Sequence, residues 1–227
     1  MLKLRTVRSF VRRQGRMTSS QKAALSGRWE RFGLTSESGN LSPEVTFGRK
    51  APLWLEIGFG MGEAFIGCAK AHPEVNLIGV EVHTPGVGRT LHALSDQSLD
   101  HVRLYHEDVN LVLDKAILED SLDRVQIFFP DPWPKKRHHK RRLISKAFLD
   151  VIAKKLKPNG LLYLATDWED YAQWMQDHLN EHPAFANAYP ETGTVPPEKI
   201  DRFHTKFEDR GLKLGHAIWD LMYLRLN

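Results

Sequence analysis

Residues 55–62, Leu55-Glu56-Ile57-Gly58-Phe59-Gly60-Met61-Gly62, decide the fold. The apolar run Leu53–Ile57 predicts a buried strand, and the residues after the glycines predict a helix over Glu63–Ala71. Glycine lets a backbone pass close to a ligand and take conformations that are closed to other residues. A strand that enters a glycine turn and a helix therefore predicts a ligand site, although a tight structural turn is the alternative.

Apolar runs alternate with helical patterns on the C-terminal side of this turn. The sequence predicts further strands at Leu77–Val82, Val102–Tyr105, Val125–Phe129 and Leu161–Ala165, and helices at Thr84–Leu94, Val109–Ile117 and Ser145–Leu156. Thr84-Pro85 is typical of an N-cap followed by proline, and Pro158-Asn159-Gly160 is typical of a stop. Five strands that alternate with helices predict an α/β fold, a mostly parallel sheet with helices on both faces.

The C-terminal stretch departs from this alternation. Arg202–Phe207, a glycine-containing turn and His216–Leu226 predict an antiparallel hairpin. A parallel sheet closed by such a hairpin is the layout of the Rossmann-like methyltransferases, but the architecture alone suits many other enzymes.

Composition and charge divide the chain into two parts. The 227 residues are 41% hydrophobic and 26% charged, which is typical of one globular domain of ordinary size. Residues 1–31 hold nine Lys/Arg and the single acid Glu30, so this stretch carries +8 and the rest −4 of the total +4. We therefore expect a basic N-terminal arm and loop at 1–48 and a catalytic domain at 49–227. A basic arm favours a polyanionic partner, most often nucleic acid.

The single cysteine, Cys68, excludes an intrachain disulfide and favours a reducing compartment, the cytoplasm. It also excludes a cysteine-held cluster, and its apolar neighbours favour a small core residue. We expect no metal site, no membrane span and no secretory signal. An organelle transit peptide is the alternative for the Arg-rich, acid-poor start, which contains Ser9, Ser19 and Ser20.

The glycine spacing distinguishes between cofactors. Dinucleotide enzymes use G-x-G-x-x-G so that a pyrophosphate can sit on the helix N-terminus. Here Glu63 holds the last of those positions, and a carboxylate there is unfavourable for a pyrophosphate. Glu56, at the strand end, suits the ammonium group of an amino-acid-bearing cofactor. The pattern favours S-adenosylmethionine over a nicotinamide cofactor.

Two further acids follow the next two strands. Glu81 ends the second strand, where a carboxylate can accept hydrogen bonds from both hydroxyls of a ribose. Asp108 follows the third strand and could reach an adenine amino group, or it could instead cap the next helix. Together with Gly58 and Gly60, these acids predict a cofactor site.

Strand four leads into Phe129-Pro130-Asp131-Pro132-Trp133-Pro134-Lys135. Prolines at alternate positions predict that the intervening residues are held extended. Asp131 follows the carboxyl end of a strand, where open α/β sheets bind ligands. We expect residues 129–135 to form a rigid loop, the reaction loop, that directs a carboxylate and an indole at a reaction centre. The alternative is a proline-rich surface turn.

The segment from Lys135 to Arg142 has six cations and no acid. Such a run is often only a solvated face, but its position beside the reaction loop favours phosphate contacts. His138 and His139 have no carboxylate or thiolate at metal-ligand spacing, so we assign them to the basic surface.

Two later segments carry polar groups. Asp167, in Thr166-Asp167-Trp168, ends strand five and is either a ligand contact or a helix N-cap. Thr205-Lys206-Phe207-Glu208 offers a hydroxyl, a cation, a stacking ring and a carboxylate in the predicted hairpin. Ordinary sheet packing with solvent-facing charges is the alternative.

These residues resemble the bacterial tRNA (guanine-N7)-methyltransferase family, whose target guanosine is at position 46, in the variable loop. The resemblance spans nearly the whole chain and is carried by Arg8–Arg16, Glu56–Gly62, Ile78–Val82, Phe129–Lys135, Thr166–Trp168 and Thr205–Glu208. It implies a class I S-adenosylmethionine-dependent methyltransferase that binds tRNA.

The resemblance also implies residue roles. Cofactor contacts are implied for Glu56, Glu81, Asp108 and Asp131, and Asp131 is also the implied catalytic residue. Substrate contacts are implied for Lys135, Asp167, Thr205, Lys206, Phe207 and Glu208. RNA contacts are implied for Arg137, His138, His139, Lys140, Arg141 and Arg142.

The chemistry of guanine N7 agrees with these roles. N7 has an in-plane lone pair and no proton, and methylation makes the ring cationic, so a nearby carboxylate stabilises the transition state. A pyrimidine C5 methyltransferase would need a cysteine nucleophile, and Cys68 is placed as a core residue. An RNA-binding subunit without turnover and a nicotinamide-dependent oxidoreductase remain as alternatives. The sequence leaves open a monomer or a homodimer, and whether Asp131 takes a proton or only orients the base.

Overall fold

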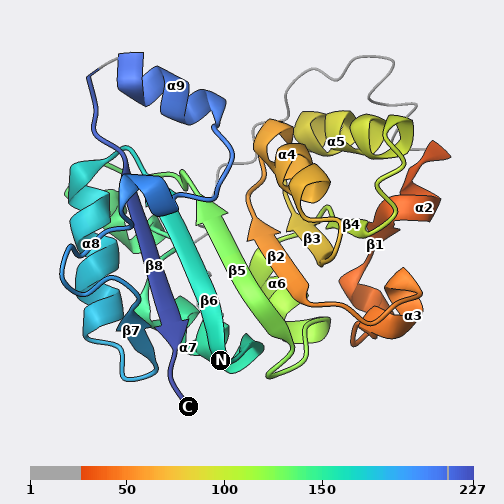
Figure 1. Cartoon of the computed structure of the whole chain (residues 1–227), viewed down its shortest axis with the longest axis horizontal. Coiled ribbons are helices and arrows are strands. Elements are labelled where there is room, and N and C mark those ends of the chain that lie inside the picture. Colours follow the sequence, from red (N-terminus) through yellow and green to blue (C-terminus); the bar gives the residue numbers. More distant parts are fainter. Residues whose placement is uncertain (1–26, 214) are drawn as a thin grey trace, which may run out of the picture.

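The computed structural model describes residues 27–213 and 215–227 (Figure 1). The most basic part of the predicted arm, residues 1–26, therefore lies outside the described residues, as do the side chains of Lys206, Phe207 and Arg210. In the described part, no helix is both long and apolar enough to cross a membrane.

A single mixed sheet forms the centre of the molecule. Across the described residues its strand order is β1-β4-β3-β2-β5-β6-β8-β7. These strands are β1 Gly33–Leu34, β2 Leu53–Ile57, β3 Asn76–Val80, β4 Val102–Tyr105, β5 Leu122–Phe128, β6 Leu156–Thr166, β7 Phe185–Asn187 and β8 Trp219–Arg225. Strands β1 to β6 are parallel, and β8 runs antiparallel to both β6 and β7. The chain order reverses between β2 and β5, the position where open α/β sheets form a ligand crevice.

Helices cover both faces of the sheet (Figure 1). The α-helices are α2 Trp29–Phe32, α3 Pro43–Phe47, α4 Glu63–Ala71, α5 Thr84–Asp96, α6 Val109–Lys115, α7 Lys146–Lys155, α8 Glu169–Asn180 and α9 Lys206–Lys213. Side chains of α6, α7 and α8 share one core with β2, β5 and β6, whereas α2, α4 and α5 share a second core with β3 and β4. This is the two-faced α/β arrangement that the alternating sequence pattern predicts.

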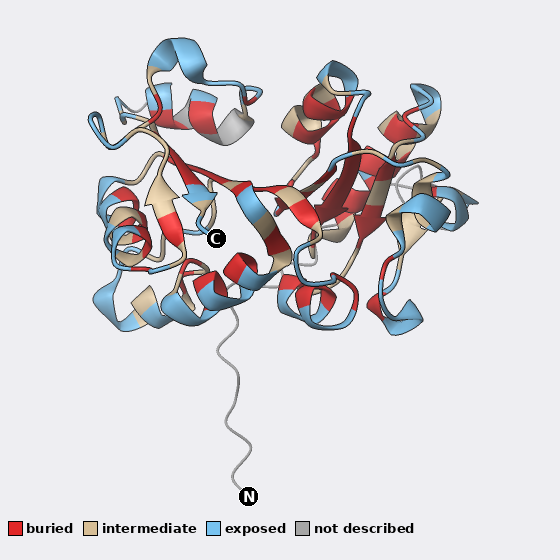
Figure 2. Cartoon of the chain, turned by 60° about the horizontal axis from the view of Figure 1, so that its bottom comes forward, coloured by how far each residue is buried: buried red, intermediate tan, exposed pale blue. Residues whose placement is uncertain are grey.

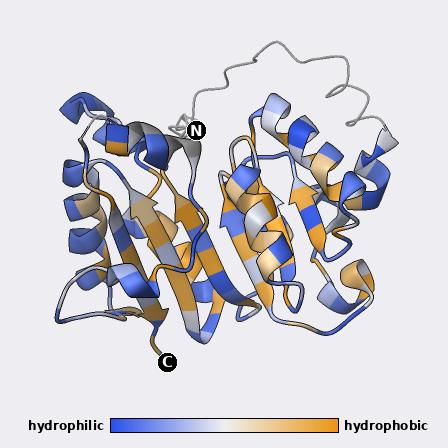
Figure 3. Ribbon diagram, turned by 45° about the horizontal axis from the view of Figure 1, so that its top comes forward, coloured by the Kyte–Doolittle hydropathy of each residue, from blue (hydrophilic) through white to orange (hydrophobic). Residues whose placement is uncertain are grey.

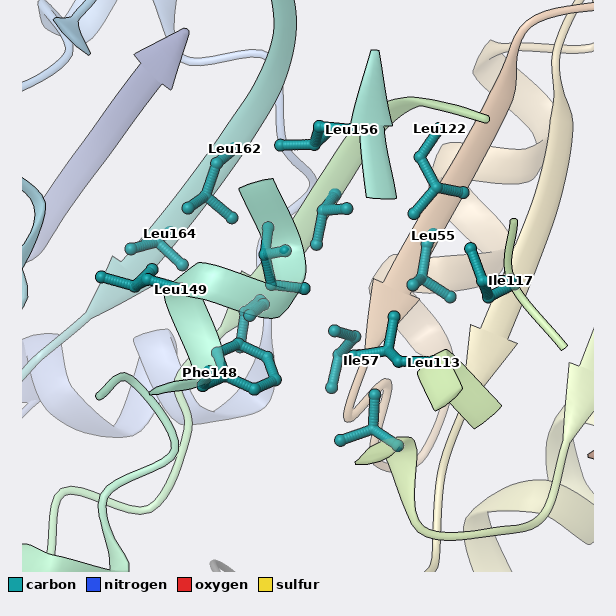
Figure 4. Close-up of a cluster of buried hydrophobic side chains, with 14 of the residues drawn as sticks. Leu55, Ile57, Leu113, Ile117, Leu122, Phe148, Leu149, Leu156, Leu162 and Leu164 are labelled. Atoms are coloured by element: carbon teal, nitrogen blue, oxygen red, sulfur yellow. The ribbon is translucent and has the colours of Figure 1, made fainter. Parts of the chain in front are cut away.

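Leucine-rich packing fixes the sheet against its helices. Figure 4 shows Leu55 and Ile57 of β2 facing Leu113 of α6, with Phe148 and Leu149 of α7 beside them, and all five side chains are buried. The central strands are largely buried (Figure 2), and they are dominated by hydrophobic residues, whereas the helices mix both kinds (Figure 3). Burying side chains of this size contributes about 1.5–3 kcal/mol each, which holds the strand ends that carry the site.

The predicted bounds hold closely where the local pattern is strong. β2 and α4 have the predicted bounds, and α7 ends before Pro158-Asn159-Gly160 as predicted. The N-cap prediction at Thr84 is wrong, because helix α5 already includes Thr84. His83 occupies the cap position without a side-chain cap bond, and Pro85 lies within the first turn.

The C-terminal antiparallel arrangement is present, but Arg202–Phe207 is not one of its strands. β8 pairs with β6 and β7, and helix α9 begins at Lys206. The reason is local: the Thr205 hydroxyl accepts a hydrogen bond from the Glu208 backbone N–H at 3.1 Å, and the Glu208 carboxylate accepts from the Thr205 N–H at 3.4 Å. This reciprocal pair is a capping box, a helix-start signal.

The described segment before residue 49 packs onto the sheet. β1 extends the parallel sheet beyond β4, and the Phe32 side chain is fully buried. From Trp29 onward the described segment is therefore part of the folded body.

Candidate functional site

A cavity of about 570 Å³ opens at the carboxyl ends of the parallel strands. It lies at the reversal of strand order between β2 and β5, and it brings together the glycine turn, Glu81 and the reaction loop. Its lining residues are Ile57, Gly58, Gly60, Val80, Glu81, Val82, His83, Glu107, Val109, Ile127, Phe128, Phe129, Pro130, Asp131, Pro132, Trp133, Pro134 and Leu143. Segments far apart in the sequence thus meet in one site.

The glycine turn presents bare backbone to this cavity. Gly58 and Gly60 have φ of +79° and +57°, and a Cβ added to either would meet nothing within 4 Å. This conformation is strained for residues that have a Cβ, and the space beside both glycines is open. Gly62 differs, because a Cβ there would lie 2.0 Å from Thr90 Oγ1. The first two glycines therefore leave bare backbone facing open space, and the third allows close packing of α4 on α5.

Glu81 lies in the cavity wall, at the end of β3. The residue is 8% exposed, and its carboxylate accepts backbone N–H bonds from Gly60 at 2.8 Å, Val82 at 2.6 Å and His83 at 2.8 Å. A carboxylate has about four acceptor positions. The side chain therefore fixes the glycine turn and retains capacity toward a ligand.

Glu56 lies beneath the turn and does not line the cavity. It is 4% exposed and accepts a hydrogen bond from Gln126 Nε2 at 2.6 Å. Burial raises the pKa of Glu56 to about 7, which the hydrogen bond from Gln126 and the charge of Arg124 only partly oppose. No cationic side chain in the described part of the chain forms an ion pair with this carboxyl. The predicted ammonium contact at Glu56 stays a prediction.

The segment after β4, the third of the predicted strands, places Glu107 rather than Asp108 in the cavity wall. The Asp108 carboxylate caps α6 by accepting the Asn110 N–H at 2.9 Å, the alternative role that the sequence left open. Glu107 accepts the Ser36 N–H at 3.0 Å and is also bonded to the Ser36 hydroxyl. Sequence reasoning missed Glu107. The signal was the strong preference of Asp for the N-cap, which leaves the adjacent glutamate for the site.

The reaction loop delivers Asp131 to the cavity from the end of β5. Asp131 is exposed and Trp133 half-buried, and both line the cavity. The prediction that the prolines hold the intervening residues extended is wrong at Trp133, which has φ +46°. Phe129 has φ +52° and donates its N–H to Ala165 O at 2.8 Å. Non-glycine residues in this region are strained, so the loop shape is held by its surroundings.

The basic run forms a 3-10 helix, Lys136–Arg141, that folds back on the loop. Lys135, Lys136, Arg137 and Lys140 are exposed. The Arg141 guanidinium carbon lies 4.8 Å from the Trp133 ring centroid, and the His138 ring meets the same indole edge-on at 5.8 Å. The exposed cations are available to phosphates, while His138 and Arg141 support the indole.

Arg142 is a correction to the predicted RNA surface. Its side chain is 1% exposed, its Nε donates to Pro132 O at 2.9 Å, and its guanidinium is bonded to Asp170. The guanidinium also lies 4.9 Å from the Tyr171 ring centroid. Arg142 is thus buried against α8 and ties the reaction loop to it, apart from the exposed cations of the basic run. His139 is half-buried nearby, edge-on to Trp174 at 5.7 Å.

Asp167 lies at the end of β6 and is not a helix N-cap. Trp168 occupies the cap position of α8 without a side-chain bond. Asp167 Oδ2 is instead 3.4 Å from His216 Nδ1, and a Cβ added at Gly211 would lie 2.9 Å from the same oxygen. Helix α9 therefore packs directly on Asp167. Glu208 is buried on the same helix, and both its oxygens bond to Arg202.

Comparison with known proteins agrees with this architecture. The family model described as "Putative methyltransferase" matches residues 50–221. The chain is 50% identical to the tRNA (guanine-N(7)-)-methyltransferase of Marinobacter nauticus over 98% of this chain and 93% of that protein. It is 47% identical to the enzyme of the same name from Chromohalobacter salexigens, over 98% and 91%.

Solved structures share the fold at low sequence identity. An rRNA methylase from Streptococcus thermophilus is 12% identical with a TM-score of 0.52, covering 85% of this chain and 92% of that one. A precorrin-6y C5,15-methyltransferase from Geobacter metallireducens is 16% identical with a TM-score of 0.52, covering 82% and 87%. The fold is therefore that of the Rossmann-like methyltransferases.

Proposed function

The chain belongs to the tRNA (guanine-N(7)-)-methyltransferase family, and we propose that its cavity methylates N7 of the variable-loop guanosine, position 46 of tRNA. The transfer of a methyl group to guanine N7 in tRNA follows from that membership, at 50% identity over nearly the full length. The target nucleotide and the roles of individual residues are our proposal. We place the enzyme in the cytoplasm, where its substrate is found.

The cavity suits S-adenosylmethionine, which when bound supplies an electrophilic methyl group. Bare backbone at Gly58 and Gly60 faces open space, as close approach to a cofactor requires. Glu81 lines the wall with acceptor capacity for ribose hydroxyls. Glu56 lies beneath the glycine turn, outside the cavity lining, and has no ion-pair partner among the described side chains; we assign the ammonium contact to this carboxyl. Asp108 and Glu107 stand together at the end of β4, and we assign the adenine amino contact to this pair.

The position of Asp131 carries the proposal. It lines the same cavity as Gly58, Gly60 and Glu81, and Phe129 and Arg142 hold its loop. Guanine N7 has no proton to lose, so Asp131 orients the base and stabilises the positive charge that develops on the ring. The carboxylate stabilises the guanine ring while its positive charge is still developing in the transition state. We propose that it contacts the cofactor as well as the substrate.

The surroundings of the cavity suit the rest of the tRNA. We propose that Lys135 and Asp167 contact the target nucleotide, together with Thr205, Lys206 and Phe207 at the start of α9. The exposed cations of the basic run, joined by the basic residues before Gly27, contact phosphates. These contacts are sequence-independent and supply most of the binding free energy.

Chemical mapping of the methylated atom tests this function. An unmodified tRNA transcript is incubated with the protein and S-adenosylmethionine, reduced with borohydride and treated with aniline, which cuts at N7-methylguanosine. We expect one dominant cut, in the variable loop. A matched transcript with 7-deazaguanosine at that nucleotide should bind and accept no methyl group. Methyl incorporation without an aniline-sensitive site, or into the 7-deaza transcript, would contradict the proposal.

A further inference from the structure

Arg202 is the centre of a buried ionic cluster beside the cavity. Its side chain is 2% exposed, and those of Glu208 and Asp220 are 7% and 3% exposed. The guanidinium donates to Asp220 through Nε at 2.6 Å and Nη2 at 2.9 Å, and to Glu208 through Nη2 at 2.9 Å and through Nη1. Tyr163 donates its hydroxyl to Asp220 at 2.8 Å. A guanidinium that forms two bidentate pairs leaves no carboxylate oxygen of the cluster without a donor.

The cluster joins three elements that are separate in the sequence. Asp220 belongs to β8 and Glu208 to the first turn of α9. The Arg202 guanidinium carbon also lies 5.3 Å from the ring centroid of Phe129, the first residue of the reaction loop. Arg202 therefore contacts the sheet, the helix on which Asp167 rests, and the base of the Asp131 loop.

The residues on either side of Arg202 contact β5 and α4, the helix that follows the glycine turn. Asp201 accepts from Arg124 of β5 at 2.7 and 3.0 Å. The Phe203 ring lies against Gly67 of α4, where an added Cβ would be 2.7 Å from the ring. Position 202 is thus fixed from both sides, which restricts the direction of its guanidinium.

We propose that Arg202 is a positioning residue for this reaction, which holds α9 and the reaction loop in one geometry. In this inference, which rests on the proposed function, Glu208 affects tRNA binding through its pair with Arg202 and not by touching the substrate. Burial opposes ionisation of Glu208, but the hydrogen bonds and charge of Arg202 keep its pKa below the ordinary value. The pair is therefore ionised and its geometry fixed. This pair therefore anchors the first turn of α9, the segment that we propose to contact tRNA.

A double-mutant cycle tests the inference. Glu208→Gln removes the charge but retains a side chain suited to the capping box. Arg202→Lys keeps the charge but loses the planar fork that makes two bidentate pairs. We expect each variant to raise KM for tRNA about tenfold or more, while the dissociation constant for S-adenosylmethionine by calorimetry stays within about twofold. The double variant should be no worse than the more impaired single variant.

If the increases in KM of the two single variants multiply in the double variant, Glu208 acts on the substrate independently of Arg202. That result would overturn the inference. An unchanged KM for tRNA in Arg202→Lys would overturn it as well. Hydrogen exchange adds a readout that does not depend on turnover: both variants should exchange faster in α9 and the reaction loop, but not in β2 and α4. Uniformly faster exchange would indicate general destabilisation and would also reject a positioning role.

Arg225→Met is the matched control, because Arg225 pairs with Asp120 near the opposite end of the same strand β8. It should leave both KM and α9 exchange unchanged. If Arg202→Met folds, it should resemble Arg202→Lys with a larger effect. Failure of the proposed function is distinguishable, because the wild-type protein itself would then give no aniline-sensitive tRNA.

Discussion

Glu56 is the residue whose burial has the clearest energetic consequence. Its pKa lies near 7 in the folded protein, against an ordinary value of 4.5, because the carboxyl is removed from water. Between these two values the folded state binds more protons than the unfolded state. The contribution of Glu56 to stability is therefore complete below pH 4.5 and is lost as the pH rises through about 7.

We predict that Glu56→Gln flattens the pH dependence of thermal stability in this interval. Glutamine has no charge to bury, so the melting temperature of the cofactor-free variant should exceed that of the wild type at pH 8. Differential scanning calorimetry from pH 5 to pH 8 measures this, with Glu119→Gln as the exposed control. Parallel stability curves for Glu56→Gln and the wild type would exclude an effect of Glu56.

Cofactor binding should be linked to the same proton. An ammonium group beside Glu56 favours the carboxylate, so binding of S-adenosylmethionine at pH 6.5 should release protons from the wild type and not from Glu56→Gln. Calorimetry in buffers of different ionisation enthalpy measures the released protons. Equal release by both proteins would place the ammonium away from Glu56.

Glu81 holds both the glycine turn and, we propose, the ribose. Glu81→Gln keeps the size of the side chain but removes the charge, so each hydrogen bond to it weakens. We predict a loss of about 1.5–3 kcal/mol in S-adenosylmethionine binding, the range for a hydrogen bond to a charged group. Titration calorimetry measures it. Unchanged affinity in a folded variant would contradict the assignment.

At the scale of elements, the sequence predicts those helices and strands whose bounds depend on neighbouring residues alone. β2 and α4 follow directly from an apolar run and a glycine turn, and their predicted bounds are confirmed. The segment after Arg202 was harder to predict, because Thr-x-x-Glu suits both a strand and a capping box. The capping box between Thr205 and Glu208 starts the helix, and the same Glu208 carboxylate also bonds to Arg202, a contact that depends on the tertiary fold. The three-residue strand β7 carries too little pattern to be predicted.

We expect the exposed and the buried cations of the basic run to have different effects on tRNA binding. Replacing the exposed Lys135, Lys136, Arg137 and Lys140 by Ala should flatten the salt dependence of tRNA affinity, by about 0.7–0.9 log units of slope for each phosphate that is no longer neutralised. Binding measured between low and moderate salt gives this slope. A slope equal to that of the wild type would mean that these cations are only a solvated face.

Arg142→Met should behave in the opposite way, because Arg142 is buried against Tyr171 and bonds to Pro132 of the reaction loop. We expect an unchanged salt slope and a lower kcat, since the loop that carries Asp131 loses an anchor. A change in salt slope without a change in kcat would restore Arg142 to the RNA surface.

At the scale of the whole molecule, the parallel sheet creates the site. Strand ends that meet at one edge made the cavity at Gly58, Glu81 and Asp131 predictable without coordinates. The contacts that connect its two halves were not predictable. Arg202 reaches Asp220 and Phe129, and Asp167 meets His216, because long loops return over the sheet, and no local periodicity records those paths.

The central claim is that this cavity directs a methyl group to guanine N7 with the help of Asp131. The most direct test is a single-turnover reaction of Asp131→Ala with saturating tRNA and S-adenosylmethionine, followed by borohydride and aniline. We predict no aniline-sensitive cut in the variable loop, while tRNA affinity falls by no more than about threefold, because phosphate contacts carry most of it. A cut formed at the wild-type rate would contradict the claim.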